Sequence, residues 1–555
     1  MKYIDIHNFV LIHAEAGKRI EEFRRLFSGH FSARKKLTGI LLLISIAALI
    51  PSCTSRFEKL NTDPNQVTAG QMEANNYRVG TKIVSMQSLV IPVEEHMYQF
   101  NESLTGGPFA GYIGSTVDTW LTRFETFNPS ADWRAWPFSN VITEFYAPYR
   151  GIVDGTDDEV ANAFANLFRV AVLNRVTDSY GPMPYSDALA NESITVKYDS
   201  QEDVYAQMFA ELDAAIEAFD NNTGLDASAW SNYDRVYYGD ISKWVKYANS
   251  LKLRLAMRIS YVAPETAAAK AAEAISGGLI LTNADNASMH PTENRMTLVY
   301  NDWEDHRVGA DILCYMTGYN DPRLKTMFLP NAAGNYVGVR IGSTVTSKTA
   351  FVDSYSNLTV ESDTPILWMN AAEVNFLLAE YYLRIAKDNA QARKYYEAGI
   401  RLSFEERGAT GADAYIADNT SMPEIYTDPL GANSYTRRMS ECKIAWDTAG
   451  DEETNLEQII TQKWIAIFPL GTEAWCEYRR TGYPKLLPAV QNLGADNVDL
   501  NRHARRLTYP VEEYSSNSAN LSEAVGILNS ESVDGNGDSM ATRVWWDCKD
   551  YTLSE

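Results

Sequence analysis

The sequence has few basic residues for its length. Its 555 residues include 49 Lys and Arg against 72 Asp and Glu, which gives a formal net charge of −23. A chain with this charge repels the phosphates of nucleic acids, and anionic membrane surfaces attract basic segments instead. We therefore expect no nucleic-acid partner and no charge-driven binding to a lipid surface.

Cysteine is also scarce, and none of the five cysteines stands in a CxxC or other zinc-ligand spacing. Cys53 directly follows a hydrophobic run that is described below. The other four could pair in three ways, but a domain of this size needs no disulfide, so buried free thiols are favoured. These four are Cys314, Cys442, Cys476 and Cys548.

The signatures of several common enzyme classes are missing. The chain has seven histidines but no HExxH pair, no GxSxG elbow and no GxxxxGK[ST] phosphate loop. With 72 acidic residues, some pair of carboxylates suited to glycoside hydrolysis exists by number alone, although no particular pair stands out. These absences favour a binding protein without a cofactor, and they leave a secreted glycoside hydrolase on a helical scaffold as an alternative.

One short segment resembles a calcium loop. In "VDGNGDSM" (533–540), Asp534, Asn536 and Asp538 have the alternate spacing of calcium ligands. Ser539 stands where such a loop has its glycine, and Trp545 stands where it has its distal glutamate. A Gly/Asp turn is therefore the favoured interpretation, and calcium is a weak candidate.

Only one long hydrophobic run is present. Residues 37–50, "LTGILLLISIAALI", follow the basic segment 34–36 and carry no charge. As a helix this run would span ~21 Å, which is short of the ~30 Å hydrocarbon core of a bilayer. It therefore predicts the apolar region of a secretion signal.

The residues after this run indicate a lipid anchor. "IPSC" (50–53) resembles a bacterial lipobox, which predicts lipidation of Cys53 after cleavage, and an ordinary signal with a coincidental cysteine is the alternative. We therefore predict a leader and lipoprotein signal peptide over 1–52 and a lipidated polar tether over 53–70. Residues 1–33 contain acidic residues that are unusual in a signal peptide, so we hypothesise a downstream translation start, which N-terminal analysis of the precursor would test.

From residue 71 the chain is predicted to be mainly helical. Apolar residues recur at helical spacing in 200–219, 241–260 and 454–468, and 371–386 with 393–406 resembles a tetratricopeptide helix pair. Residues 336–346 are the best strand candidate. Long irregular segments are expected between the helices, at 101–140, 221–240, 283–365, 407–455 and 490–545.

Several motifs in order resemble the SusD/RagB family of outer-membrane nutrient-binding lipoproteins. They are "FEKLNTDPN" (57–65), "RVTDSYGPMPYSDAL" (175–189), "YNDPRL" (319–324), "EVNFLLAE" (373–380), "QKWIAIFPLGTEAWCEYRRTGYP" (462–484) and "WWD" (545–547). The resemblance is closest to the branch with NTDPN after the lipobox, and it extends in family order from residue 53 to near the C-terminus.

This resemblance implies a single domain over 71–555. Such a domain has discontinuous tetratricopeptide-like helix pairs that form a scaffold for a large, loop-rich ligand face. It also implies an anchored protein on the bacterial outer surface that captures a glycan or a peptide for a SusC-like TonB-dependent β-barrel transporter, without catalysis. A structural adaptor that binds no ligand is a further alternative. The motifs "RRTGYP" and "YNDPRL" are expected to fix loop geometry through arginine hydrogen bonds and turns.

Aromatic residues are plentiful, with 12 Trp and 32 Tyr. Because flat rings pack against sugar rings at small entropic cost, loop aromatics are the candidate ligand residues, with a glycan favoured and a peptide as the alternative. The candidates are Tyr112, Trp120, Trp133, Trp136 and Trp303. Packing in the core is the competing interpretation for each of them, and it is the expected role of Trp244, Trp464 and Trp475.

Overall fold

The computed structural model describes residues 76–188 and 195–551. The predicted leader over 1–52, the tether over 53–70 and Cys53 lie outside the described residues. No helix among those described has the length and apolar character needed to cross a bilayer.

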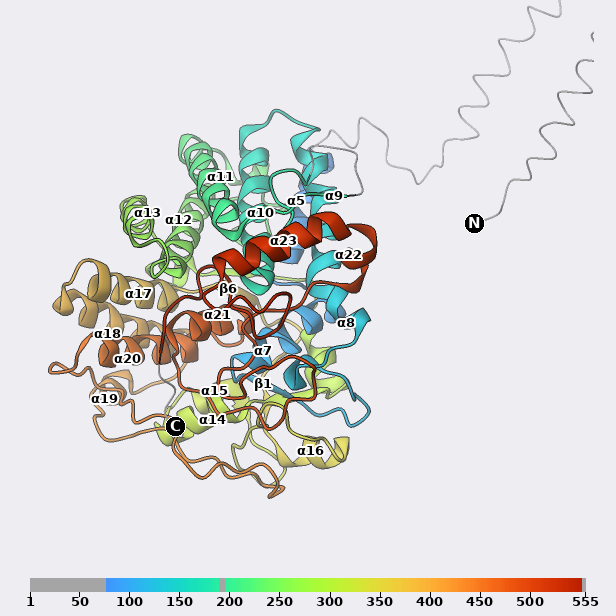
Figure 1. The fold of residues 1–555 in the computed structure, drawn as a ribbon. Coiled ribbons are helices and arrows are strands. Elements are labelled where there is room, and N and C mark those ends of the chain that lie inside the picture. The colour runs from blue at the N-terminus through green and yellow to red at the C-terminus, as the bar shows by residue number, and fades with distance from the viewer. Residues whose placement is uncertain (1–75, 189–194, 552–555) are drawn as a thin grey trace, which may run out of the picture. The chain divides into compact units, whose positions relative to one another are not determined.

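The first part of the described chain forms a group of six long helices, which we call the N-terminal helix group. They are α5 (Tyr77–Val90), α9 (Val141–Val153), α10 (Glu159–Tyr180), α11 (Gln201–Asn221), α12 (Ile241–Arg258) and α13 (Pro264–Ser276). Neighbours in sequence pack side by side, α10 with α11 and α12 with α13 (Figure 1). The predicted cap of α11 is present, since Ser200 Oγ accepts a hydrogen bond from Asp203 N at 3.0 Å.

A second group, the C-terminal helix group, contains the predicted tetratricopeptide-like pair. It comprises α17 (Ala371–Glu380), continued by the π-helical turn η8 (Tyr381–Ile385), α18 (Asn389–Glu406), α20 (Glu452–Ala466) and α21 (Gly471–Thr481). The pair α17 and α18 is tightly packed, because a Cβ atom at Gly399 would lie 2.8 Å from the Phe376 ring. The predicted helix pair and the mainly α fold class are therefore confirmed.

The strands are short and pair only two at a time. β1 (Ile113–Ser115) pairs with β3 (His306–Val308), β2 (Ala287–Met289) with β6 (Ile366–Met369), and β4 (Phe328–Leu329) with β5 (Asn357–Leu358), all antiparallel. The predicted strand over 336–346 is wrong. This segment makes a single bridge, between Val339 and Gly309, and its alternating apolar residues serve burial rather than a ladder.

The remaining elements are short, except for one helix that the sequence pattern did not reveal. α23 (Ser518–Glu531) lies inside the segment expected to be irregular, and it buries Leu521, Ala524 and Leu528. The other short elements are α6 (Glu95–Tyr98), η2 (Gln99–Ser103), α7 (Gly106–Phe109), η3 (Phe124–Thr126), α8 (Ala131–Ala135), η4 (Trp136–Asn140), η5 (Ala227–Ala229), η6 (Asn283–Asp285), η7 (Leu298–Asp302), α14 (Ala310–Gly318), α15 (Leu324–Met327), α16 (Lys348–Ser354), α19 (Ala412–Ile416) and α22 (Val511–Ser516).

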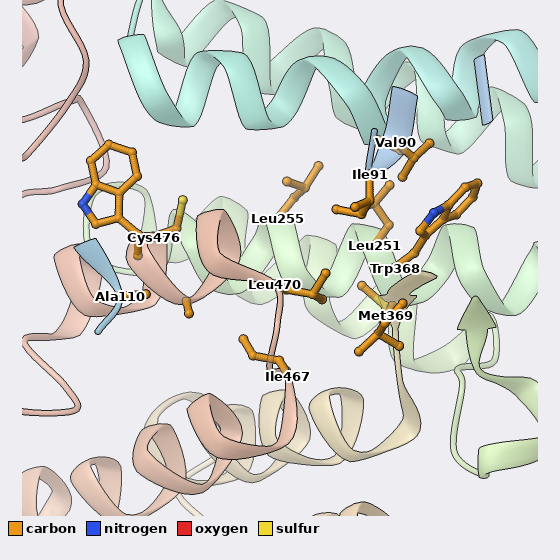
Figure 2. Packing of buried hydrophobic residues seen from close by; sticks show 14 of the residues in the cluster. Val90, Ile91, Ala110, Leu251, Leu255, Trp368, Met369, Ile467, Leu470 and Cys476 are labelled. Atoms are coloured by element: carbon orange, nitrogen blue, oxygen red, sulfur yellow. The ribbon is translucent and has the colours of Figure 1, made fainter. Parts of the chain in front are cut away.

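A continuous hydrophobic core joins the two helix groups. Figure 2 shows Leu251 and Leu255 of α12 gathered with Ile91, Trp368 and Leu470 where the groups meet. The three tryptophans expected in the core are buried, and each indole N–H has a hydrogen-bond acceptor within 2.8 Å. This confirms the predicted packing role of Trp244, Trp464 and Trp475.

Arg480 and Arg323, from the two scaffold motifs, are buried and bound through all their side-chain nitrogens. Arg480 donates to Glu380 through both terminal nitrogens at 2.7 Å and also binds Glu477 at 2.8 Å. Arg323 of "YNDPRL" binds Asp321 at 2.6 Å. Buried ions are tolerated only with such partners, so these motifs hold the scaffold together, as predicted.

All four cysteines in the described chain are free thiols, as predicted. Cys314 and Cys476 are buried, whereas Cys442 and Cys548 are partly exposed.

Candidate functional site

Four of the five predicted aromatic residues come together on one surface. Trp133 lies in α8, Trp136 begins η4, Trp120 follows β1, and Trp303 follows η7. Ser130 starts α8 by accepting a hydrogen bond from Trp133 N at 3.4 Å. All four side chains pack on the core and remain partly exposed.

The buried ring of Phe100 contacts two of these tryptophans, Trp133 and Trp136. Its ring stacks on Trp136 with centroids 5.0 Å apart and an interplanar angle of 11°, and it meets Trp133 edge to face at 5.5 Å. Trp120 stands perpendicular to Trp133 at 5.2 Å. Because aromatic pairs at these separations attract one another, the rings hold fixed and differing orientations.

His96 connects Trp303 to the other rings. Its imidazole centroid lies 5.2 Å from Trp303 and 6.4 Å from Trp136, and its side chain is exposed. We call the exposed face of His96, Trp120, Trp133, Trp136 and Trp303 the tryptophan surface. Sequence reasoning missed His96 and Phe100, although their spacing of four residues places them one helical turn apart, on one side of the backbone.

Tyr112 was wrongly predicted as a ligand residue. Its side chain is completely buried, with ring centroids 5.4 Å from Trp464 and 5.0 Å from Phe468. Its hydroxyl donates to the Trp464 carbonyl. This tyrosine therefore belongs to the core.

Polar groups lie next to Trp120. Lys348 Nζ is 2.8 Å from Asp305 Oδ1, and Lys348 N donates to Asp118 Oδ2 at 3.3 Å. Asp305 precedes His306, whose ring centroid is 6.0 Å from Trp120. Burial lowers the pKa of His306 to about 4, so this imidazole is neutral at pH 7. The edge of the surface therefore carries one ammonium group and two carboxylates.

The two carboxylates of the calcium candidate, Asp534 and Asp538, each form an ion pair with an arginine. Asp538 binds Arg506 and accepts from Tyr514 Oη at 2.6 Å, and Asp534 Oδ2 lies 3.5 Å from Arg543 Nε. Gly535 and Gly537 adopt positive φ angles of 49° and 71° in the turn, and Asn536 is exposed. This geometry corresponds to the Gly/Asp turn and gives calcium no support.

One other group could hold a metal within the described ranges. Ligand atoms of Glu94, Glu95 and His96 lie within 4.8 Å of one another. Both carboxylates already have partners, because Glu94 caps α6 at Met97 N (2.7 Å) and Glu95 binds Arg295 at 2.6 Å. These contacts explain the cluster without an ion.

Comparison with known proteins gives a consistent match. The model of the SusD-like family, described as Susd and RagB outer membrane lipoprotein, matches residues 59–547. A SusD homologue from Bacteroides thetaiotaomicron is 46% identical, with a TM-score of 0.82, over 86% of this chain and 100% of that chain. A SusD homologue from Bacteroides uniformis is 43% identical, with a TM-score of 0.80, over 85% and 100% of the two chains.

A third structure has a stated ligand. The chitin-binding SusD homologue from Flavobacterium johnsoniae is 33% identical, with a TM-score of 0.80, over 85% of this chain and 99% of that chain. No curated protein gives a significant match.

Proposed function

Because the chain belongs to the SusD-like family of outer membrane lipoproteins, we propose that it captures oligosaccharides on its tryptophan surface. Family membership identifies a nutrient-binding lipoprotein rather than an enzyme. The class of the ligand and the route that it takes afterwards are our proposals.

The observation that carries the proposal is the grouping of four partly exposed tryptophans in different orientations. Each sugar ring has an apolar face that packs on an indole, and its hydroxyls need polar partners beside that ring. Lys348, Asp118 and Asp305 supply such partners at the Trp120 edge. The chitin-binding relative supports a glycan rather than a peptide.

We further propose that the captured glycan passes to a SusC-like TonB-dependent β-barrel transporter. The support is the family assignment, together with the lipobox-like Cys53 and the polar tether predicted after it. A lipid on Cys53 would keep the protein on the outer membrane at the cell surface, next to such a barrel. Co-purification of the lipoprotein with a barrel protein from outer membranes would test this step, and a Cys53→Ala variant tests the anchor.

Calorimetric titration tests the capture proposal. The protein is titrated with chito-, malto- and xylo-oligosaccharides and with peptides, and each sample is then assayed for new products. We expect saturable binding of one glycan class without turnover. Release of shortened products would contradict the proposal in favour of a glycoside hydrolase, and peptide binding alone would contradict the glycan class.

Variants of the same protein locate the site. Trp133→Ala and Trp136→Ala should each weaken glycan binding by about tenfold, because the loss of one aromatic contact corresponds to roughly 1 kcal/mol or more. Tyr77→Ala is the matched control, since Tyr77 is a 41% exposed aromatic residue on α5, outside the surface. Equal affinity in all three variants would refute the site and leave the structural adaptor as the better interpretation.

A further inference from the structure

A second cavity lies apart from the tryptophan surface. It encloses about 500 Å³ and is lined by residues from 435–439, 482–488 and 549–551, with Glu453 from the first turn of α20. None of the residues that line it belongs to the tryptophan surface, and Figure 1 shows α20 and α8, the helix that carries Trp133, on opposite sides of the view. Its volume falls within the ~300 to ~1,000 Å³ range of small-molecule sites.

Four cations line this cavity in a chain that is strongly acidic overall. They are Arg437, Arg438, Lys485 and Lys549, against the two carboxylates of Glu453 and Asp550. The Asp550 side chain is 96% exposed and leans towards Arg543, 3.5 Å away. The cavity therefore has an excess of positive charge.

Two of the cations have no ion-pair partner among the described residues. Arg437 is exposed, and its guanidinium lies 5.8 Å from the centroid of the Tyr435 ring. Arg438 donates to the carbonyl of Pro423. Both guanidinium groups keep unused N–H donors, which suit a carboxylate in a fork geometry.

A third cation, Lys549, is partly buried and pairs with the Glu453 carboxylate. Lys549 Nζ lies 2.7 Å from Glu453 Oε2. Burial lowers the pKa of Lys549, and the charges of Arg384 and Arg480 lower it further, against the effect of Glu453. An anion in the cavity would stabilise this ammonium.

Three tyrosines complete the lining, namely Tyr435, Tyr483 and Tyr551. Tyr435 lies beside the unpaired Arg437, and Tyr483 lies beside Lys549, 5.3 Å from its ammonium. Flat rings next to cations match a ligand that has both an apolar ring face and a carboxylate. We propose that this cavity is a second ligand site that binds an acidic sugar, a uronate residue of a glycan. This site goes beyond capture on the tryptophan surface and does not depend on it.

Three probes test separately whether the cavity requires a sugar ring and whether it requires a carboxylate. Trigalacturonate carries the ring and the carboxylate, its methyl ester keeps the ring without the charge, and trialanine offers a carboxylate without a sugar. We expect saturable binding of trigalacturonate that weakens as salt is raised, with much weaker binding of the other two. Equal binding of the methyl ester would refute the charge argument, and equal binding of trialanine would refute the sugar assignment.

Paired variants locate the binding. Arg437→Gln with Arg438→Gln should weaken trigalacturonate binding at least about tenfold, because each lost charge-assisted hydrogen bond is strong. Arg393→Gln with Arg401→Gln is the control, since it removes the same charge from exposed arginines on α18. Equal losses in both double variants would refute a specific site and indicate general charge attraction.

A tryptophan variant separates this proposal from the proposed function. Trp136→Ala should leave trigalacturonate binding unchanged. If it abolishes binding while the Arg437/Arg438 variant does not, acidic sugars bind the tryptophan surface, and the second site is refuted although capture stands. Absence of any trigalacturonate binding to the wild-type protein also refutes the second site. Far-ultraviolet circular dichroism of each variant establishes that it is folded.

Discussion

A buried carboxyl group on α14 should make the stability of this protein depend on pH. Asp311 is 1% exposed, and its Oδ1 accepts a hydrogen bond from Leu487 N at 2.5 Å. Its Oδ2 has no hydrogen-bond partner in the described structure. Burial raises the pKa of Asp311 from 3.8 to about 7.

The raised pKa sets the sign and size of the effect. A carboxyl with a raised pKa in the folded state contributes its full stability below the unfolded-state value near 4, and that contribution is lost as the pH rises towards 7. Because one pKa unit corresponds to about 1.4 kcal/mol, the total loss is about 4 kcal/mol. Between pH 5 and pH 8, this group alone should lower the free energy of unfolding by about 3 kcal/mol.

Asp311→Asn removes the titration with little change of shape. The amide oxygen can still accept from Leu487 N, and no charge has to be buried at high pH. Relative to wild type, the variant should therefore gain about 3 kcal/mol of unfolding free energy on going from pH 5 to pH 8. At every pH, the free energy of unfolding of the variant is also lowered by ~1–3 kcal/mol, because the buried amide N–H donors of the new asparagine lack an acceptor.

Urea denaturation followed by tryptophan fluorescence measures this difference at each pH. All other titrating groups are shared by the two proteins, so their contributions cancel in the comparison. Asp220→Asn is the control, because it makes the same substitution at an exposed carboxylate at the end of α11 and leaves Asp311 in place. If the difference between Asp311→Asn and wild type does not change with pH, the reasoning about burial is wrong.

Three other stability predictions follow from the packing of the helices and are measured by urea denaturation. Arg480→Met should destabilise the protein by about 1.5–3 kcal/mol, because Glu380 and Glu477 would each lose one buried cationic partner, Glu380 keeping Arg384 and Glu477 keeping Arg258 and Lys463; a loss below 1 kcal/mol would contradict this. Gly399→Ala should lower the free energy of unfolding by about 1–3 kcal/mol, because the new methyl group would clash with Phe376. Gly526→Ala, in open space on α23, should raise it by about 0.5–1 kcal/mol, because alanine favours a helix more than glycine does. A change of the same sign in both variants would refute the packing argument. Ser200→Ala should cost about 1 kcal/mol through loss of the α11 cap, and no measurable loss would contradict the cap.

The helices could be predicted because their signals are local. The apolar spacing in α11 and α12 agrees with the burial of those helices, and Ser200 acts as a cap within the same few residues. The strand prediction for residues 336–346 was wrong because the burial of this segment depends on contacts that are not local. Val339 and Ile341 are buried by distant parts of the chain, and alternation alone does not reveal whether a partner strand is present.

The candidate site was only partly predictable. The loop sequence supplied Trp133 and Trp136, but it could not reveal that Tyr112 points inward, because side-chain direction at the start of β1 is set by contact with Trp464, 352 residues away. His96 escaped notice because its role depends on Trp303, which lies far along the chain.

The support of Trp136 by Phe100 has a thermodynamic consequence. An exposed side chain that must be immobilised on binding costs about 0.5–1.5 kcal/mol of conformational entropy. The near-parallel contact of these two rings, and the perpendicular contact of Trp120 with Trp133, already restrict the indoles before any ligand binds. The protein thus meets much of this entropic cost during its own folding, and the fixed orientations of the rings would favour a ligand whose flat faces match them.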